Sequence, residues 1–131
     1  MKFLLMMHAP RGTGDWDLFS WSKEDLDAHL RFLTELNREL EEAGELAGIL
    51  GLAPPAEARV VRAGSDGNPV VSDGPFPESK EFLAGYWMVD VDSAERAYEI
   101  AGKASTAPGP GGAPLNMPIE VRQVMGAPAE D

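Results

Sequence analysis

The chain has 131 residues and a mass of 14.1 kDa, enough for one ordinary domain and too little for two separate cores. Its 44% hydrophobic and 25% charged residues are typical of a soluble globular protein, not of a disordered or membrane-embedded one. A net charge of −11 argues against binding to nucleic acid or anionic membranes, because both would repel an acidic surface. The absence of cysteine excludes disulfides, thiolate metal sites and a cysteine nucleophile.

The opening segment contains one basic residue, Lys2, and an apolar run that is too short for the core of a signal peptide. No apolar run elsewhere approaches the roughly 18 residues that a membrane span requires. The sequence therefore predicts a cytoplasmic protein.

The first predicted elements are a buried strand and an amphipathic helix. Lys2–His8 is a nearly continuous apolar run, typical of a strand buried on both faces, and Ala9–Trp21 follows it as a loop. Ser22, with Asp25 three residues later, predicts a capped helix start, and Gly44 predicts the helix end. At helical spacing one face of this segment is apolar and comprises Leu26, Leu30, Leu33, Leu36 and Leu40.

Four strands are predicted in the middle of the chain. Glu45–Leu52 has the length of a strand and ends before two prolines. Glu57–Ala63 and Pro69–Ser72 flank a turn cluster and predict a hairpin. Phe82–Val91 alternates and is apolar on both faces, so we expect both to be covered; one face holds Gly85, Trp87, Val89 and Val91, and the other Ala84, Tyr86 and Met88.

A second helix and a last strand complete the chain. Asp92–Lys103 predicts a helix capped by Asp92 or Ser93, with a small apolar stripe of Ala94, Ala97, Tyr98 and Ala101. Ala104–Pro118 holds four prolines and three glycines and is interpreted as a surface loop, with Gly109–Gly112 as a linker. Ile119–Met125 alternates as a strand. We expect a single domain over residues 1–126 and a disordered tail over residues 127–131.

This order of elements predicts an α+β fold, a ferredoxin-like βαββαβ sandwich with an inserted hairpin. Right-handed crossovers place both helices on one face of the sheet. Two strands, Lys2–His8 and Phe82–Val91, are nevertheless apolar on both faces. We therefore expect a homodimer in which two sheets pack face to face as a dimeric α/β barrel. Coverage of the second face by the chain's own loops is the alternative.

Several segments together resemble the DGPF branch of the YCII-related family: Asp73-Gly74-Pro75-Phe76, Gly85–Val91, Glu120-Val121-Arg122, and the helix from His29 to its exit at Leu46. The resemblance covers nearly the whole chain. It implies dimeric α/β barrels of ferredoxin-like subunits, and activities that are mostly unassigned. One branch of the family removes chloride from a hydroxylated aromatic ring. The resemblance also implies a catalytic histidine with an acidic partner; the histidine matches His29, and the partner is not placed by any motif.

The candidate catalytic residues are His29 and Asp73. A histidine can exchange protons near neutral pH, and His29 interrupts the apolar stripe of the first helix. Asp73 heads a turn, where a rigid carboxylate can orient an imidazole or take up a proton. In the alternative interpretation, His29 is a core-edge residue bonded to a carbonyl and Asp73 only caps its turn.

The candidate substrate-binding residues are His8, Phe76, Lys80, Trp87 and Arg122. The two cations would capture an anionic substrate, and Trp87 or Tyr86 would supply an aromatic wall of the dimer cavity. Each also has a structural alternative: His8 ends a strand, Phe76 fills an apolar gap, and the cations pair with neighbouring acids. The histidine spacing matches no metal site and no cofactor motif is present, so neither a metal nor a cofactor is expected.

Two functions of different classes remain open at this point. The first is a cofactor-free enzyme in which His29 moves a proton on a small aromatic or enolisable molecule in the dimer cavity. The second is a non-catalytic domain that binds a small molecule or serves as an accessory or regulatory module. Both imply a homodimer, and neither implies binding to nucleic acid or membrane.

Overall fold

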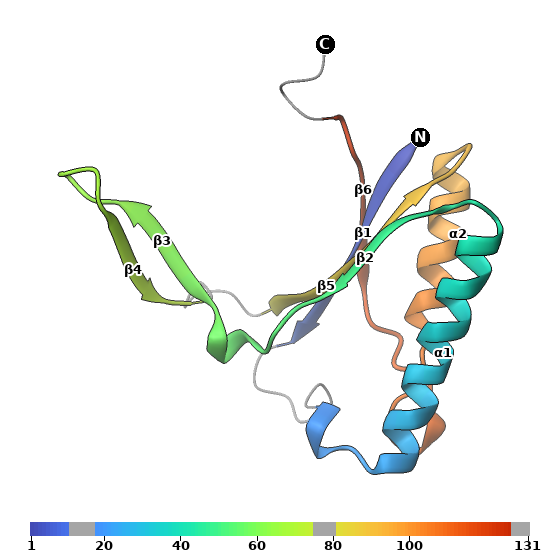
Figure 1. Ribbon diagram of the computed structural model, residues 1–131. Coiled ribbons are helices and arrows are strands. Elements are labelled where there is room, and N and C mark those ends of the chain that lie inside the picture. Colours follow the sequence, from blue (N-terminus) through green and yellow to red (C-terminus); the bar gives the residue numbers. More distant parts are fainter. Residues whose placement is uncertain (11–17, 75–80, 127–131) are drawn as a thin grey trace.

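Two helices packed on one face of a four-stranded antiparallel sheet form the body of the protein in a computed structural model (Figure 1), which describes residues 1–10, 18–74 and 81–126. A separate hairpin projects from the body. The sheet contains β1 (Lys2–Pro10), β2 (Leu46–Gly51), β5 (Glu81–Asp90) and β6 (Ile119–Gln123), the helices are α1 (Lys23–Glu42) and α2 (Ala94–Ser105), and the hairpin is β3 (Arg59–Ala63) with β4 (Pro69–Asp73).

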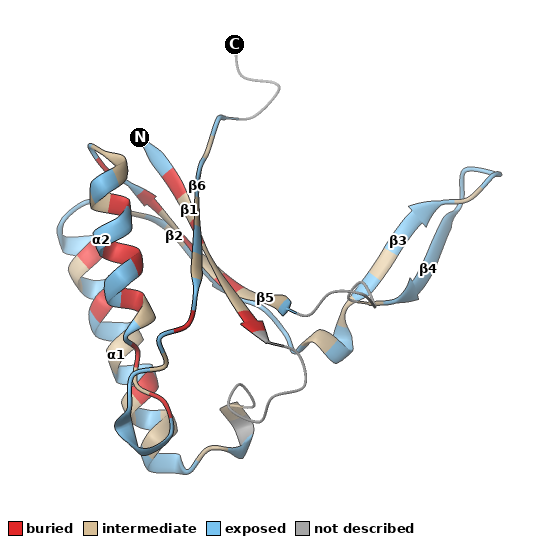
Figure 2. Cartoon of the chain, turned by 180° about the vertical axis from the view of Figure 1, so that it is seen from behind, coloured by how far each residue is buried: buried red, intermediate tan, exposed pale blue. Residues whose placement is uncertain are grey.

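The order of the strands in the sheet is β2-β5-β1-β6, and all neighbours are antiparallel. α1 connects β1 to β2, and α2 connects β5 to β6, so each helix crosses over one intervening strand. Both helices lie on the same side of the sheet, as expected (Figures 1 and 2). This arrangement is compatible with the ferredoxin-like sandwich that the order of elements predicts.

The core lies between the sheet and the helices (Figure 2). Leu5 of β1 pairs with Trp87 of β5, and both side chains are buried. The alternation predicted for β5 is confirmed, because its inward residues are buried and their neighbours are only half-buried. Gly85 permits close pairing with β2, since a Cβ atom there would lie 2.7 Å from the carbonyl oxygen of Leu50.

α1 begins and ends where the sequence predicts. The Ser22 side chain accepts a hydrogen bond from the Asp25 amide at 3.1 Å, and Gly44 adopts a positive φ of 72° just after the helix. The predicted apolar stripe was wrong at one edge: Leu30 is 48% exposed, while His29 is buried beside Leu36 and Leu40. The buried face therefore follows residues 29, 36 and 40.

Two expectations for the region around α2 were also wrong. Tyr98 is 57% exposed, because the buried positions at i, i+3, i+4 and i+7 are Ala97, Ile100, Ala101 and Ala104. The segment after α2 is more than a surface loop, since Ala107, Gly109 and Met117 are buried in it. The linker predicted at Gly109–Gly112 is a tight turn, in which the Gly109 amide donates to the Ala113 carbonyl at 2.7 Å.

The second face of the sheet points away from both helices (Figures 1 and 2). Within the described ranges, no helix or strand packs against it. We call it the open face, and strand register assigns to it Leu4, Met6 and His8 of β1, Leu50 of β2, Tyr86 and Met88 of β5, and Glu120 and Arg122 of β6. Its central side chains are apolar, as the two-faced strands predicted, and within one chain they are only half-buried.

The hairpin of β3 and β4, residues 59–73, is called the arm. Its two strands pair with each other and join no other strand of the described structure. The arm extends from the side of the sheet opposite the helices (Figure 1). Its turn is closed by a hydrogen bond from the Gly64 amide to the Asn68 carbonyl at 2.8 Å, which confirms the predicted hairpin.

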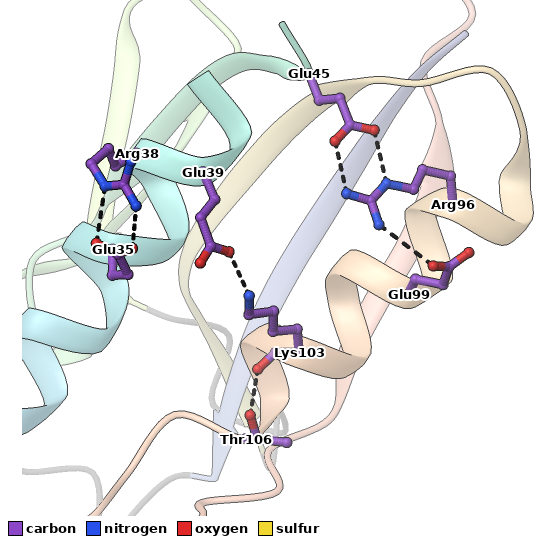
Figure 3. A network of polar contacts seen from close by, with 8 residues as sticks. All are labelled: Glu35, Arg38, Glu39, Glu45, Arg96, Glu99, Lys103 and Thr106. Atoms are coloured by element: carbon purple, nitrogen blue, oxygen red, sulfur yellow. Dashed lines mark hydrogen bonds and ion pairs between the residues drawn. The ribbon is translucent and has the colours of Figure 1, made fainter. Parts of the chain in front are cut away.

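Ion pairs connect α2 to α1 and to Glu45, which lies between α1 and β2 (Figure 3). Arg96 of α2 donates two hydrogen bonds of 2.8 Å to the carboxylate of Glu45, whose side chain is 17% exposed. Lys103 of α2 pairs with Glu39 of α1. The bidentate geometry is the strong form of this interaction, so Glu45 and Arg96 hold the second helix in place.

Acid should weaken this contact. The hydrogen bond from Arg96 lowers the pKa of Glu45 below its ordinary value of about 4.3. A lowered folded-state pKa gives stability that is fully present above the unfolded value and is lost as the pH falls through the folded value. We expect Glu45→Gln to lower the free energy of unfolding by about 1–2 kcal/mol at neutral pH. This difference from wild type should shrink progressively below about pH 4.3.

Urea unfolding of wild type and Glu45→Gln between pH 3 and 7 measures the difference in their free energies of unfolding. Glu99→Gln is the matched control, because Glu99 contacts the same Arg96 at 3.5 Å from an exposed position and should change stability little. A stability difference between wild type and Glu45→Gln that does not depend on pH would contradict the expectation.

Candidate functional site

An imidazole–carboxylate pair lies on the open face. Nε2 of His8 lies 3.0 Å from Oε1 of Glu120. The register of β1 and β6 produces the pair, since Met6 pairs with Glu120 and His8 is two residues further along the same face. The pairing of β1 with β5 shifts register here, since Met7 pairs with Gly85 and His8 pairs with Leu83, so the extra residue lies on β5. Such bulges redirect side chains beside sites.

The chemistry of the pair follows from its donors and acceptors. The carboxylate of Glu120 only accepts hydrogen bonds, so the imidazole of His8 donates through Nε2. In the neutral form of the ring the other nitrogen, Nδ1, then carries a lone pair, and it has no hydrogen-bond partner among the described residues. A carboxylate that holds one imidazole nitrogen while the other stays available is the arrangement of an oriented base.

His8 also lines a hollow of about 630 Å³. The hollow lies between the ends of β1 and β5 and the segment at the root of the arm. Its size is within the range of small-molecule sites, and most of its wall is apolar. The wall includes Leu52, Pro54, Pro55, Phe82 and Leu83, with the carboxylates of Glu57 and Glu81 at its margin.

His29 lies on the other side of the sheet. Its side chain is 2% exposed, and its Nδ1 is 3.0 Å from the carbonyl oxygen of Pro108. The ring of Trp21 packs edge-on against it with centroids 5.3 Å apart. His29 lines neither the hollow beside His8 nor the one formed by Asp27, Leu30 and neighbouring residues of α1. Its contacts join α1 to the turn after α2.

Asp73 lies at the end of the arm, and its side chain is 98% exposed. Its ion-pair partner is Arg59 on the neighbouring strand, at 3.7 Å. Within one chain, the structure does not bring Asp73 together with His29: one belongs to the arm and the other is buried under α1 (Figure 1). Within a single chain, Asp73 is therefore not the acidic partner of His29, and the assignment of catalytic roles to these two residues stays a prediction.

The predicted binding residues divide between the two faces of the sheet. Trp87 is buried under the helices, where its indole N–H donates to Oδ1 of Asn37 at 2.9 Å, so Tyr86 is the aromatic of that strand on the open face. Arg122 shares the open face with His8, and its Nε lies 3.8 Å from Oε2 of Glu120. Phe76 and Lys80 lie outside the described residues.

Glu120 is the residue of this site that sequence reasoning missed. The alternation of the last strand already places Glu120 and Arg122 on the same face. The pairing of β6 with β1, which brings Glu120 to His8 across 112 residues of sequence, has no local signal. The wall of the hollow was missed for the same reason, because it joins three separate segments.

Among residues 1–10, 18–74 and 81–126, no three side chains of histidine, aspartate or glutamate gather as metal ligands. Neither helix in that part of the chain combines the length and the apolar character needed to cross a membrane.

Comparison with known proteins gives two matches. Residues 1–111 match the YCII-related domain. An uncharacterised protein of Rhizobium meliloti (strain 1021) is 38% identical over 88 residues, which are 67% of this chain and 70% of that protein. Assignment to the DGPF branch stays a prediction. The chain belongs to the YCII-related family.

Proposed function

We propose that this YCII-related domain acts as a cofactor-free homodimer that binds a small molecule at the hollow beside His8 and exchanges a proton with it. The observation that carries the proposal is the 3.0 Å pair of His8 and Glu120 at the wall of that hollow. His8 takes the catalytic part that the sequence assigns to His29. Glu120 takes the part of the acidic partner, for which Asp73 was the candidate and which no sequence motif placed.

The homodimer rests on the open face. Leu4, Met6, Tyr86 and Met88 form an apolar centre there that is only half-buried, and Leu50 beside them is 56% exposed. Apolar area of this kind is stabilised by removal from water. Association of two chains through their open faces removes both centres from water and places the two His8 side chains in the space between subunits.

The proton exchange involves one donor and one acceptor. A substrate O–H or acidic C–H approaches Nδ1 of His8, and its proton moves to that nitrogen while the bonding electrons stay on the substrate. The resulting imidazolium keeps its Nε2–H bond to Glu120, whose negative charge stabilises it. The apolar wall excludes water and accepts a planar ligand.

His29 is assigned a structural part in this proposal. It is buried, its Nδ1 bonds to a backbone carbonyl, and it touches Trp21. Such a histidine fixes the turn of residues 107–117 against α1. Removing it would leave the Pro108 carbonyl without this donor, which affects stability before it affects any ligand.

A hydroxylated aromatic probe tests the site. We expect 4-nitrophenol to perturb the amide NMR signals of Leu52, Phe82 and Leu83, and to show the visible absorbance of its phenolate at a lower pH when bound than when free. Perturbation at these positions without a change in ionisation would favour the non-catalytic binding domain. Perturbation confined to α2 would contradict the site.

A further inference from the structure

The arm lacks partners along most of its length. Every residue of β4 is exposed, and four of the five residues of β3 are exposed. A two-stranded hairpin by itself is marginally stable in water. The arm of this chain is nevertheless regular, with five cross-strand pairs from Arg59–Asp73 to Ala63–Pro69. Such a hairpin needs a surface to pack on.

The two faces of the arm differ in character. On one face, Val61 pairs with Val71 and the next pair outward joins alanine with proline. Val61 is 58% exposed and Val71 is 59% exposed. The other face carries Arg62 opposite Val70, and Val60 packs there near Gly74 at the root of the arm. Beyond the Arg59–Asp73 ion pair at its root, the first face is the one that is apolar and uncovered; we call it the valine face.

We propose that the valine face packs on the open face of a second copy of this chain, so that the two arms of a dimer each clasp the opposite subunit. The inference rests on the proposed homodimer and adds the surface that holds it together. The arm and the open face lie on the same side of the molecule, away from the helices (Figure 1). A chain that presents both surfaces presents the same pair to its copy, which a two-fold axis satisfies.

The dimensions of the two surfaces agree. A strand of five residues spans about 17 Å, and the four strands of the sheet, spaced about 4.8 Å apart, span about 14 Å. One arm is thus long enough to cross the apolar centre of the partner's open face. Val61 and Val71 would meet aliphatic and aromatic side chains of Met6, Tyr86 and Met88.

The distribution of charge also favours a second copy. The chain has a net charge of −11, yet the arm is neutral, because Arg59 and Arg62 are balanced by Asp66 and Asp73. α1 carries seven acidic and three basic residues on the far side of the sheet. Contact through arms and open faces keeps the two acidic helix layers outward and apart, so like charges do not oppose association.

This contact between the arm and the partner's open face, which we call the clasp, would also close the ligand site. Pro54, Pro55 and Glu57, in the segment that leads into the arm, form part of the wall of the hollow beside His8. An arm seated on a partner is fixed at its root. Dimerisation therefore completes the wall of the hollow, and binding of the probe should weaken when the arm is released.

Substitution of one valine on each face of the arm separates the contact from the fold. We expect wild type to sediment at about twice 14.1 kDa, and Val71→Asp to raise the dimer dissociation constant at least about 30-fold by placing a charge in the contact. Val70→Asp is the matched control: the neighbouring residue, on the opposite face and 48% exposed, should change the constant less than threefold. Circular dichroism checks that both variants are folded.

The outcomes distinguish the arm from the dimer itself. A dimeric wild type with both variants equally dimeric overturns the clasp and leaves the homodimer standing. A wild type that is monomeric at 100 µM overturns both. If Val71→Asp fails to fold, it is replaced by Val71→Thr, which removes apolar surface without adding a charge. Val71→Thr should raise the dimer dissociation constant about threefold or more.

A distance measurement gives an independent test. The chain has no cysteine, so Ser65→Cys in the arm turn accepts a single spin label. Labelled chain is mixed with unlabelled wild type enriched in ¹⁵N, which reports only contacts between subunits. We expect stronger broadening of amide signals in β1 and β5 than in α1 and α2. The reverse order overturns the clasp.

Discussion

Replacing Trp87 with alanine is expected to lower the free energy of unfolding by about 3–5 kcal/mol. Trp87 is 1% exposed at the centre of the sheet, paired with Leu5 on one side and Ile49 on the other. Alanine leaves a cavity beneath both helices and removes the hydrogen bond to Asn37. The total free energy of unfolding of a natural domain is about 5–15 kcal/mol, so the variant should be close to unfolding.

Trp87→Phe is the informative control for this result. Phenylalanine restores most of the apolar volume but leaves Oδ1 of Asn37 without its donor, so the loss should fall to about 1–3 kcal/mol. Urea unfolding followed by circular dichroism measures both variants. Equal losses in the two would show that the hydrogen bond, rather than the packing, dominates at this position.

Replacing His8 with glutamine is expected to weaken binding of 4-nitrophenol about 10- to 100-fold and to abolish its ionisation on binding. A hydrogen bond to a charged group contributes about 1.5–3 kcal/mol, and glutamine cannot take up the proton. Isothermal titration gives the affinity, and the visible absorbance of the phenolate gives the ionisation. His8 is only partly buried on the open face, so the fold should be unaffected.

Two neighbours of His8 serve as graded controls. Glu120→Gln keeps an acceptor for Nε2 but loses the charge that stabilises the imidazolium, so binding of the phenolate should weaken about two- to fivefold. Arg122→Gln should change the affinity for the phenolate less than twofold, because Arg122 is exposed and its Nε lies 3.8 Å from Oε2 of Glu120. A loss for Arg122→Gln as large as for His8→Gln would indicate anion capture instead of proton exchange. A loss for His29→Gln alone would contradict the assignment to His8.

Local signals in the sequence predicted most elements of the fold. The Ser22 cap and Gly44 bound the first helix because each acts on backbone groups within a few residues. The alternation of Phe82–Val91 placed Trp87 and Val89 inward because side chains of a strand alternate whatever it pairs with. The turn at Gly64–Asn68 likewise fixed the arm as a hairpin.

The misjudged positions lie where burial depends on a neighbouring element. Leu30 was placed inward by the helical period, but the sheet and the turn at Pro108 meet α1 around His29 instead. Tyr98 was placed inward on a stripe that the packing of α2 shifts toward Ile100. The Gly109–Gly112 segment has the composition of a linker, yet it contacts α1, and Ala107 and Met117 on either side of it are buried.

By itself the sequence determined the acidic composition, the order of the elements, the resemblance to the YCII-related family and the apolar second face of the central strands. These properties depend on composition and on contacts between residues close in the chain. Only the tertiary structure decided which of the candidate side chains lie together: it separated His29 from Asp73 and joined His8 to Glu120 across the β1–β6 pairing. Strand pairing between distant segments sets those distances, and no local pattern encodes them.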